Sequence, residues 1–213
     1  MRIAMSITGV TLVLAGGAAF FWNETRTPEA ALVRAITPEQ ESIALPQAPF
    51  RLHDPVDEFL ERITQKHFGV FITPETSPVQ NDRFTGWHTG VDVEYEDTAG
   101  DIGVRAIADG IVIESTFAKG YGGVVVIRHI IDGKTLLALY GHLDPASILP
   151  KNTNVRQGQT IGVLGEGGTH ETDDVRKHLH FSILKKDEID LRGYVQDEKE
   201  LEAWYDPQTF YAR

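Results

Sequence analysis

Between residues 90 and 184 the chain alternates short runs of Val, Ile and Leu with turns that carry Gly or Asp. Runs of this length between turn residues are typical of β-strands. Residues 130–135 place Asp132-Gly133 between two apolar runs, which predicts a β-hairpin. No stretch alternates strands with long helices, so a mainly β fold is expected rather than a doubly wound sheet. The predicted strands are residues 90–94, 111–117, 124–129, 135–140, 160–164 and 178–184.

Residues 3–22 form an uncharged, apolar stretch that follows Arg2. At about 1.5 Å per residue, such a helix matches the roughly 30 Å hydrocarbon core of a bilayer. A retained signal anchor is favoured by this length and by Trp22, whereas small residues at 17–19 fit a cleaved signal peptide. Both interpretations predict an extracytoplasmic location, tethered to the cytoplasmic membrane by residues 3–22 or secreted after cleavage. A buried core helix is less favoured at this terminal position.

The segment after the apolar stretch has the composition of a linker. Prolines recur through residues 23–55, whereas residues 56–64 carry apolar side chains at i, i+3, i+4 and i+7 from Val56. This spacing predicts a short amphipathic helix. The predicted organisation is a signal anchor or signal peptide (1–22), a linker (23–55), a β domain (56–190) and an acidic C-terminal tail (191–213).

Composition limits the chemistry that the chain can perform. The formal net charge is −11, and binding to nucleic acid needs a cationic face, so no nucleic-acid partner is expected. The chain has no cysteine, which excludes disulfides, thiol nucleophiles and cysteine-ligated zinc. A metal site would have to use His, Asp and Glu.

Three motifs place histidines where such a site could form. His88 precedes Asp92 by four residues, and His178 and His180 flank Leu179. In a strand, residues i and i+2 share a face, so both imidazoles would point one way and Leu179 the other. His142 ends an apolar run. Imidazole and carboxylate together suit zinc, which takes four ligands and leaves one position open in catalytic sites.

Each motif alone has an ordinary structural explanation, since a pair of histidines on an amphipathic strand is more often packing or surface. Their combination in a strand-rich, cysteine-free domain favours a site. His53, His67 and His129 are interpreted as structural, and His170, in a polar loop, as a weaker candidate for substrate contact. The glycine-rich residues 162–168 lack the Lys-Ser/Thr of a phosphate loop and predict a turn.

The order of the motifs over about residues 66–186 resembles the lysostaphin-type (LytM-like) zinc metalloendopeptidases of bacterial cell walls. The matching text is Phe68-Gly69-Val70, Pro74, His88-Thr89-Gly90-Val91-Asp92-Val93, Ala106, Ala108-Asp109-Gly110-Ile111-Val112, Gly120-Tyr121-Gly122-Gly123-Val124-Val125-Val126-Ile127-Arg128-His129, Tyr140-Gly141-His142-Leu143, Val155-Arg156-Gln157-Gly158-Gln159 and His178-Leu179-His180-Phe181.

The resemblance implies an antiparallel β-sheet or β-sandwich peptidase domain with a groove over the sheet. It implies one Zn²⁺ held by His88, Asp92 and His180, with His142 and His178 as the catalytic pair. Its substrates would be the stem or bridge peptides of peptidoglycan, whose cross-links it would hydrolyse. Both catalytic histidines are expected to titrate near neutral pH and to exchange protons with water, oxyanion or leaving amine. The sequence does not divide these duties between them.

The chain departs from the family pattern in two segments. Residues 72–87 are stretched, and residues 168–177 replace a short Gly-Thr/Ser approach to the H-x-H motif. Both are expected to border the groove and to affect substrate choice. Three functions remain open: an active zinc peptidase, which the intact site residues favour, a non-catalytic binding or activator module of cell-wall hydrolases, and a carrier-like β sandwich. The last is disfavoured because no lysine occupies a suitable hairpin tip.

Overall fold

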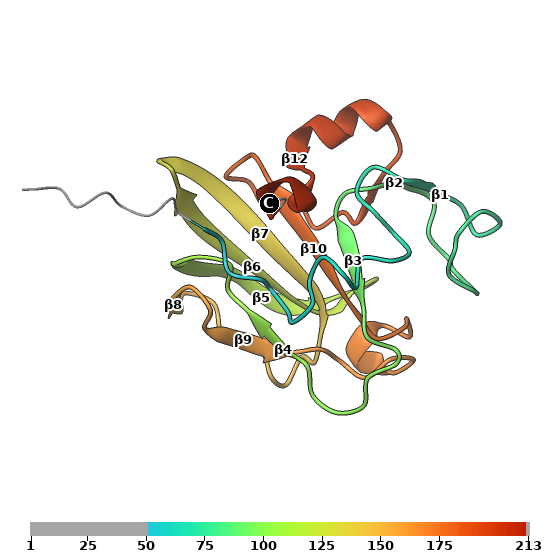
Figure 1. The fold of residues 1–213 in the computed structure, drawn as a ribbon, viewed down its shortest axis with the longest axis horizontal. Coiled ribbons are helices and arrows are strands. Elements are labelled where there is room, and N and C mark those ends of the chain that lie inside the picture. The colour runs from blue at the N-terminus through green and yellow to red at the C-terminus, as the bar shows by residue number, and fades with distance from the viewer. Residues whose placement is uncertain (1–50, 212–213) are drawn as a thin grey trace, which may run out of the picture. The chain divides into compact units, whose positions relative to one another are not determined.

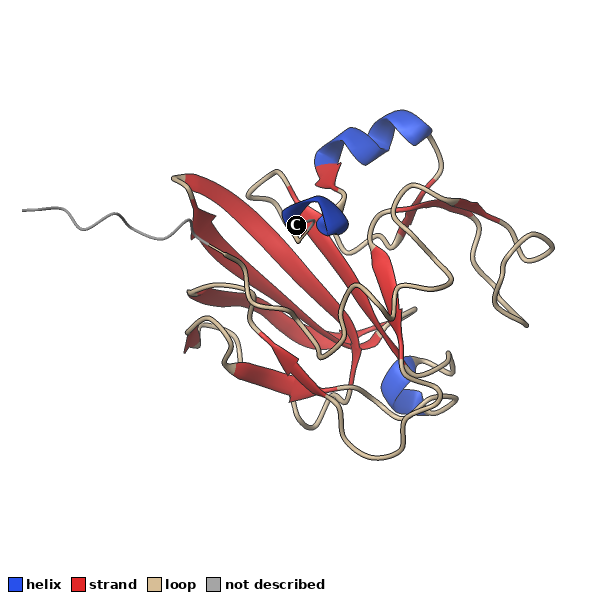
Figure 2. Ribbon diagram, in the orientation of Figure 1, coloured by secondary structure: helices blue, strands red, loops and turns tan. Residues whose placement is uncertain are grey.

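The computed structural model describes residues 51–211, which are mainly β (Figures 1 and 2). The predicted N-terminal apolar segment and most of the predicted linker lie outside these residues. The strands are β1 (Phe71–Ile72), β2 (Gly86–His88), β3 (Val91–Glu94), β4 (Gly103–Arg105), β5 (Gly110–Ala118), β6 (Gly122–Ile131), β7 (Lys134–Leu143), β8 (Asn154–Val155), β9 (Thr160–Val163), β10 (His178–Leu184), β11 (Tyr194–Val195) and β12 (Trp204–Tyr205). Three short 3-10 helices are η1 (His170–Thr172), η2 (Glu198–Ala203) and η3 (Pro207–Phe210).

One antiparallel sheet organises the described chain. Its strand order is β12-β10-β7-β6-β5-β8, and β3 pairs with β10 beside this path. Smaller sheets are formed by β1-β2-β11 and by β4-β9. All six predicted strands are present. The predicted hairpin is confirmed as the β6–β7 connection, where Ile131 pairs with Lys134 and both Asp132 and Gly133 have positive φ.

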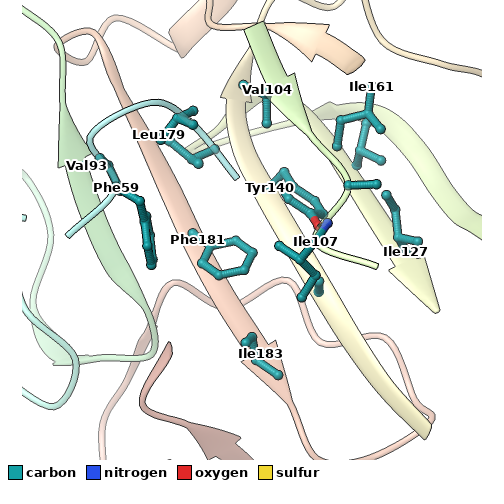
Figure 3. Packing of buried hydrophobic residues seen from close by; sticks show 14 of the residues in the cluster. Phe59, Val93, Val104, Ile107, Ile127, Tyr140, Ile161, Leu179, Phe181 and Ile183 are labelled. Carbon is teal, nitrogen blue, oxygen red and sulfur yellow. Dashed lines mark hydrogen bonds between the residues drawn. The ribbon is translucent and has the colours of Figure 1, made fainter. Parts of the chain in front are cut away.

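The larger hydrophobic core covers one face of this sheet (Figure 3). Phe181 of β10 lies at its centre, with its ring centroid 5.7 Å from that of Phe59 and 5.3 Å from that of Tyr140. The Tyr140 hydroxyl accepts a hydrogen bond from the backbone N–H of Ile107, so its polar atom is satisfied inside the core. Burying aromatic rings in this way contributes much of the hydrophobic stabilisation of a small domain.

Alternation along the strands sends the neighbouring side chains to the opposite face. In β10, Leu179, Phe181 and Ile183 belong to the larger core, whereas His178 and His180 do not. In β6 and β7, the residues of the second face form another apolar cluster with Tyr121 and Trp204. The predicted division of β10 into an apolar face and a histidine face is therefore confirmed.

The predicted helix over residues 56–64 is wrong. These residues form turns, and Glu58 has φ of 52°, which a right-handed helix does not accommodate. Val56, Phe59 and Ile63 are nonetheless buried. The apolar spacing therefore marked the buried residues of this segment, although its backbone forms turns, with one i to i−4 hydrogen bond from Arg62 to Glu58, and no continuous helix.

The C-terminal residues pack on the β domain. β11 pairs with β2, β12 pairs with β10, and Trp204 is buried in the second apolar cluster. Between β11 and β12 lies the 3-10 helix η2, which begins with a capping box at Asp197. In residues 51–211, no helix is long and apolar enough to span a bilayer.

Replacing Phe181 by Ala should lower the free energy of unfolding by about 3–5 kcal/mol, because the side chain is fully buried and the cavity would lie between two aromatic rings. Denaturant unfolding measures this change. Ile130, which is 72% exposed on β6, provides the control: Ile130→Thr should change stability by no more than about 0.5 kcal/mol. Equal losses in both variants would contradict the central position of Phe181 in the core.

Candidate metal centre

Three buried side chains converge where β2, β3 and β10 meet. His88 Nε2 lies 3.0 Å from His180 Nδ1 and 3.2 Å from Asp92 Oδ1, and His180 Nδ1 lies 3.1 Å from the same oxygen. Their ligand atoms form a group that could hold a metal ion. Zinc–nitrogen and zinc–oxygen bonds of about 2.0–2.2 Å give tetrahedral edges of about 3.3–3.6 Å. The triad therefore fits zinc after a movement of a few tenths of an ångström.

Backbone pairing sets the positions of two of these residues. His180 is directly opposite Asp92 in the antiparallel β3–β10 ladder, so both side chains leave the same face of the sheet. Gly90 lies just before this ladder, where an added Cβ would be 2.4 Å from the Phe181 carbonyl oxygen. The glycine in the His88–Asp92 motif is thus required by close approach of the two strands.

A second contact orients the His88 ring. His88 Nδ1 is 3.1 Å from the backbone carbonyl oxygen of His67, to which it donates as the protonated nitrogen. Nε2 then keeps its lone pair and faces Asp92 and His180. Metal-binding histidines are commonly oriented by such a hydrogen bond from the other ring nitrogen.

A β-bulge brings His142 to the same site. Gly141 pairs with Val124 and Leu143 with Gly123, so His142 is an extra residue in β7, and its φ is 64°. A bulge redirects a side chain that regular alternation would send to the other face. The His142 ring consequently lies 4.2 Å from the His178 ring, measured between centroids.

Burial and nearby charges determine the protonation of the site. Burial opposes ionisation of Asp92, yet His178 and His88 beside it hold its pKa well below the usual range. Burial lowers the pKa of His142 to about 3, and burial with the nearby Arg176 lowers that of His178. Both shifts run against the expectation that these histidines titrate near neutral pH, because burial favours the neutral imidazoles.

Sequence reasoning missed two residues that contact the site. Tyr121 was noted only within a motif, but its ring lies 5.3 Å from both His142 and His180, between centroids. Its buried hydroxyl has no hydrogen-bond partner among residues 51–211. Arg176 donates to Asp92 Oδ2 from 2.9 Å. An added Cβ at Gly141 would lie 2.3 Å from the Tyr121 ring, a contact between distant residues that no local sequence pattern reports.

The side chains of the four remaining histidines do not belong to this cluster. His53 and His67 have exposed side chains, and His129 is buried with Nδ1 against the Asp109 carbonyl oxygen. His170 is exposed and stacks on Phe117, with ring centroids 4.4 Å apart. Its weaker assignment as a substrate contact stays a prediction.

A groove of about 1100 Å³ opens onto the cluster. Asp92, His142, His178 and His180 line it, together with residues 78–84 and 174–177. Both segments that depart from the family pattern therefore border the groove, as expected. Arg83 and Asp173 form an ion pair between these two walls. This ion pair joins the two segments beside the cluster of His88, Asp92 and His180.

Comparison with known proteins agrees with this geometry. The model of peptidase family M23 matches residues 86–191. These residues form a domain of peptidase family M23, and the resemblance to LytM-like proteins is confirmed. The match contains all five residues singled out from the sequence, since they lie between His88 and His180.

Similar proteins include an enzyme and an activator. The DD-carboxypeptidase/endopeptidase Mpg of Neisseria meningitidis serogroup B is 38% identical over 94 residues, which cover 44% of this chain and 19% of that protein. The murein hydrolase activator EnvC of Escherichia coli (strain K12) is 37% identical over 83 residues, which cover 39% and 18%. The match spans about a fifth of the length of these curated relatives.

The fold also occurs in a solved assembly. A chain in the structure of the SpoIIQ–SpoIIIAH pore-forming complex aligns with a TM-score of 0.51 and 22% identity, over 76% of this chain and 92% of that chain. At this level of identity the likeness concerns the fold alone.

Proposed function

We propose that the β domain, residues 56–190, is a zinc-dependent endopeptidase that hydrolyses peptide cross-links of bacterial peptidoglycan. The observation that carries the proposal is the convergence of His88 Nε2, Asp92 Oδ1 and His180 Nδ1 within 3.2 Å of one another at the base of a groove. The M23 family match supports peptidase chemistry, and the relative named DD-carboxypeptidase/endopeptidase supports a cell-wall substrate.

The three converging residues would hold one zinc ion. Zinc bound there supplies a Lewis acid that polarises a peptide carbonyl and lowers the pKa of water. Asp92 contributes the only carboxylate of the triad, and the two histidines contribute imidazole nitrogens. The groove beside these residues would hold the scissile amide.

His142 and His178 would move protons. His178 Nδ1 is 2.8 Å from the Arg176 carbonyl oxygen and donates to it, which leaves Nε2 as the proton acceptor toward the site. Burial lowers the pKa of His142 to about 3, which favours its neutral form, and the hydrogen bond from Nδ1 makes His178 the better placed of the two to accept a proton. The imidazole that accepts the proton of the attacking water would then hold that proton for the leaving amine, so the transfer balances within one turnover. The buried Tyr121 hydroxyl, which has no hydrogen-bond partner among residues 51–211, would be free to donate to the developing oxyanion.

Substitutions separate metal binding from proton transfer. Changing His88, Asp92 or His180 to Ala should remove both zinc and hydrolysis, because each supplies one of three protein ligands. Changing His142 or His178 to Ala should leave zinc nearly stoichiometric and lower turnover by about 10²–10⁴-fold. Elemental analysis and single-turnover assays measure the two effects. Full zinc content in all five variants would place the metal elsewhere, and an empty His178→Ala with a loaded His180→Ala would reverse the roles of these two residues.

Cleavage of purified peptidoglycan tests the substrate. The zinc-loaded protein should convert cross-linked muropeptide dimers into monomers and release new amino groups, which mass spectrometry and amine labelling detect. His142→Ala, loaded with zinc, is the matched control and should give little product. New reducing ends without new amino groups would show glycan cleavage and contradict the proposal.

The similarity to EnvC supports a second candidate, a non-catalytic activator of cell-wall hydrolases. An activator would leave the muropeptides intact on its own, with or without zinc, and would accelerate a separately purified murein hydrolase. The same digest therefore distinguishes the two functions, provided that each protein is assayed alone and then together.

The proposed substrate requires an extracytoplasmic location. Residues 3–22 would carry the domain across the cytoplasmic membrane and remain as its tether. Cell fractionation should recover the full-length protein with the membrane, and N-terminal sequencing should begin at residue 1 or 2. A soluble protein that begins near Phe20 would instead show a cleaved signal peptide, and a full-length cytosolic protein would contradict both interpretations.

A further inference from the structure

Arg176 is bonded to the one carboxylate of the triad. Its guanidinium donates to Asp92 Oδ2 from 2.9 Å and makes two hydrogen bonds to Glu94, at 2.6 and 2.8 Å. The side chains of all three residues are nearly or fully buried. Asp92 and Glu94 are separated by one residue in β3, so both carboxylates leave the same face and meet one guanidinium.

This arrangement divides the two oxygens of Asp92 between different partners. Oδ1 faces His88 and His180, whereas Oδ2 is held by Arg176. A carboxylate with one oxygen fixed presents the other as a single, oriented ligand. Fixing the ligand before the metal binds removes a conformational cost that an unrestrained side chain would carry.

Glu94 compensates the positive charge that Arg176 brings next to the candidate metal ligand Asp92. A guanidinium beside a metal ligand would, by itself, repel a divalent cation and draw charge from the carboxylate. The bidentate contact with Glu94 compensates the positive charge of Arg176 where both are buried. Arg176 can therefore restrain Asp92 while the pair adds no net charge to the site.

We propose that Arg176 and Glu94 act as a charge-neutral clamp that positions Asp92 for zinc, and that this clamp sets the zinc affinity of the site. The inference rests on the proposed metal site. Arg176 belongs to residues 168–177, which replace the short approach typical of the family, so the departure supplies a positioning residue for the metal centre as well as a groove wall.

Arg176 contacts Asp92 and His178 through different atoms, so its two contacts can be tested separately. That imidazole bonds to the backbone carbonyl oxygen of Arg176, which any substitution retains, whereas Asp92 is held by the side chain. Side-chain variants of Arg176 should therefore alter Asp92 and leave the tautomer of His178 unchanged.

Zinc affinity of the full-length chain, measured by competition with a chelator of known affinity, tests the clamp. Arg176→Gln should weaken zinc binding by about 10–100-fold. Arg176→Lys should recover part of this loss, because one ammonium cannot reproduce the fork of a guanidinium. Arg105→Gln, which breaks an ion pair with Asp57 outside the site, is the matched control and should bind zinc as the wild type does.

A double variant separates positioning from general stability. Arg176→Met with Glu94→Met replaces a buried ion pair by apolar side chains, a change that often preserves folding. The metal-free double variant should melt within a few degrees of the wild type, yet bind zinc about 10–100-fold more weakly. A folded double variant with wild-type zinc affinity would overturn the clamp. If it does not fold, wild-type affinity in Arg176→Lys and Arg176→Gln together would overturn it.

The zinc affinity of the wild-type chain and the affinities of the variants relative to it test different proposals. A wild-type chain that does not bind zinc would contradict the proposed function itself, and the clamp with it. A wild-type chain that binds zinc, with variants that bind equally well, would contradict only the clamp.

Discussion

The antiparallel pairing of β3 with β10 positions two of the three residues of the candidate metal triad. It sets Asp92 opposite His180 and Glu94 opposite His178, so one ladder aligns two carboxylates with two imidazoles. Because side chains alternate along a strand, a register shift of one residue would send His180 into the core and Leu179 into the groove. The same strand β10 also pairs with β7 and β12, which makes such a shift costly over much of the sheet.

One face of β10 packs in the hydrophobic core, and the other carries histidines of the candidate site. Phe181 and Ile183 are fully buried in the larger core, while His178 and His180 line the groove. A packed core allows little adjustment, so the position of the histidine face follows from the packing beneath it. The bulge in β7 turns His142 toward the face that carries His178 and His180. Regular alternation would have turned His142 to the other face.

The sequence predicted what depends on local pattern. Long apolar strands, the Asp132-Gly133 hairpin and the two faces around Leu179 all follow from alternation and turn chemistry, and each is observed. Strands of two or three residues, such as β1 and β4, are too short to show a period. The 56–64 segment had helical spacing but packs as turns, because tertiary contacts determined its backbone. Arg176 was missed because its partner Asp92 is 84 residues away, and no local pattern reports such a contact.

The charge arrangement explains why so polar a cluster is stable when buried. Isolated buried charges are costly, and two carboxylates, Asp92 and Glu94, face a single guanidinium from Arg176. Burial lowers the pKa of His178 and His180, so these imidazoles add lone pairs and no positive charge. One excess negative charge therefore lies beside a convergence of nitrogen and oxygen donors. A divalent cation bound there, as we propose, would complement both features at once, because it would offset the excess negative charge and accept the lone pairs of the donors.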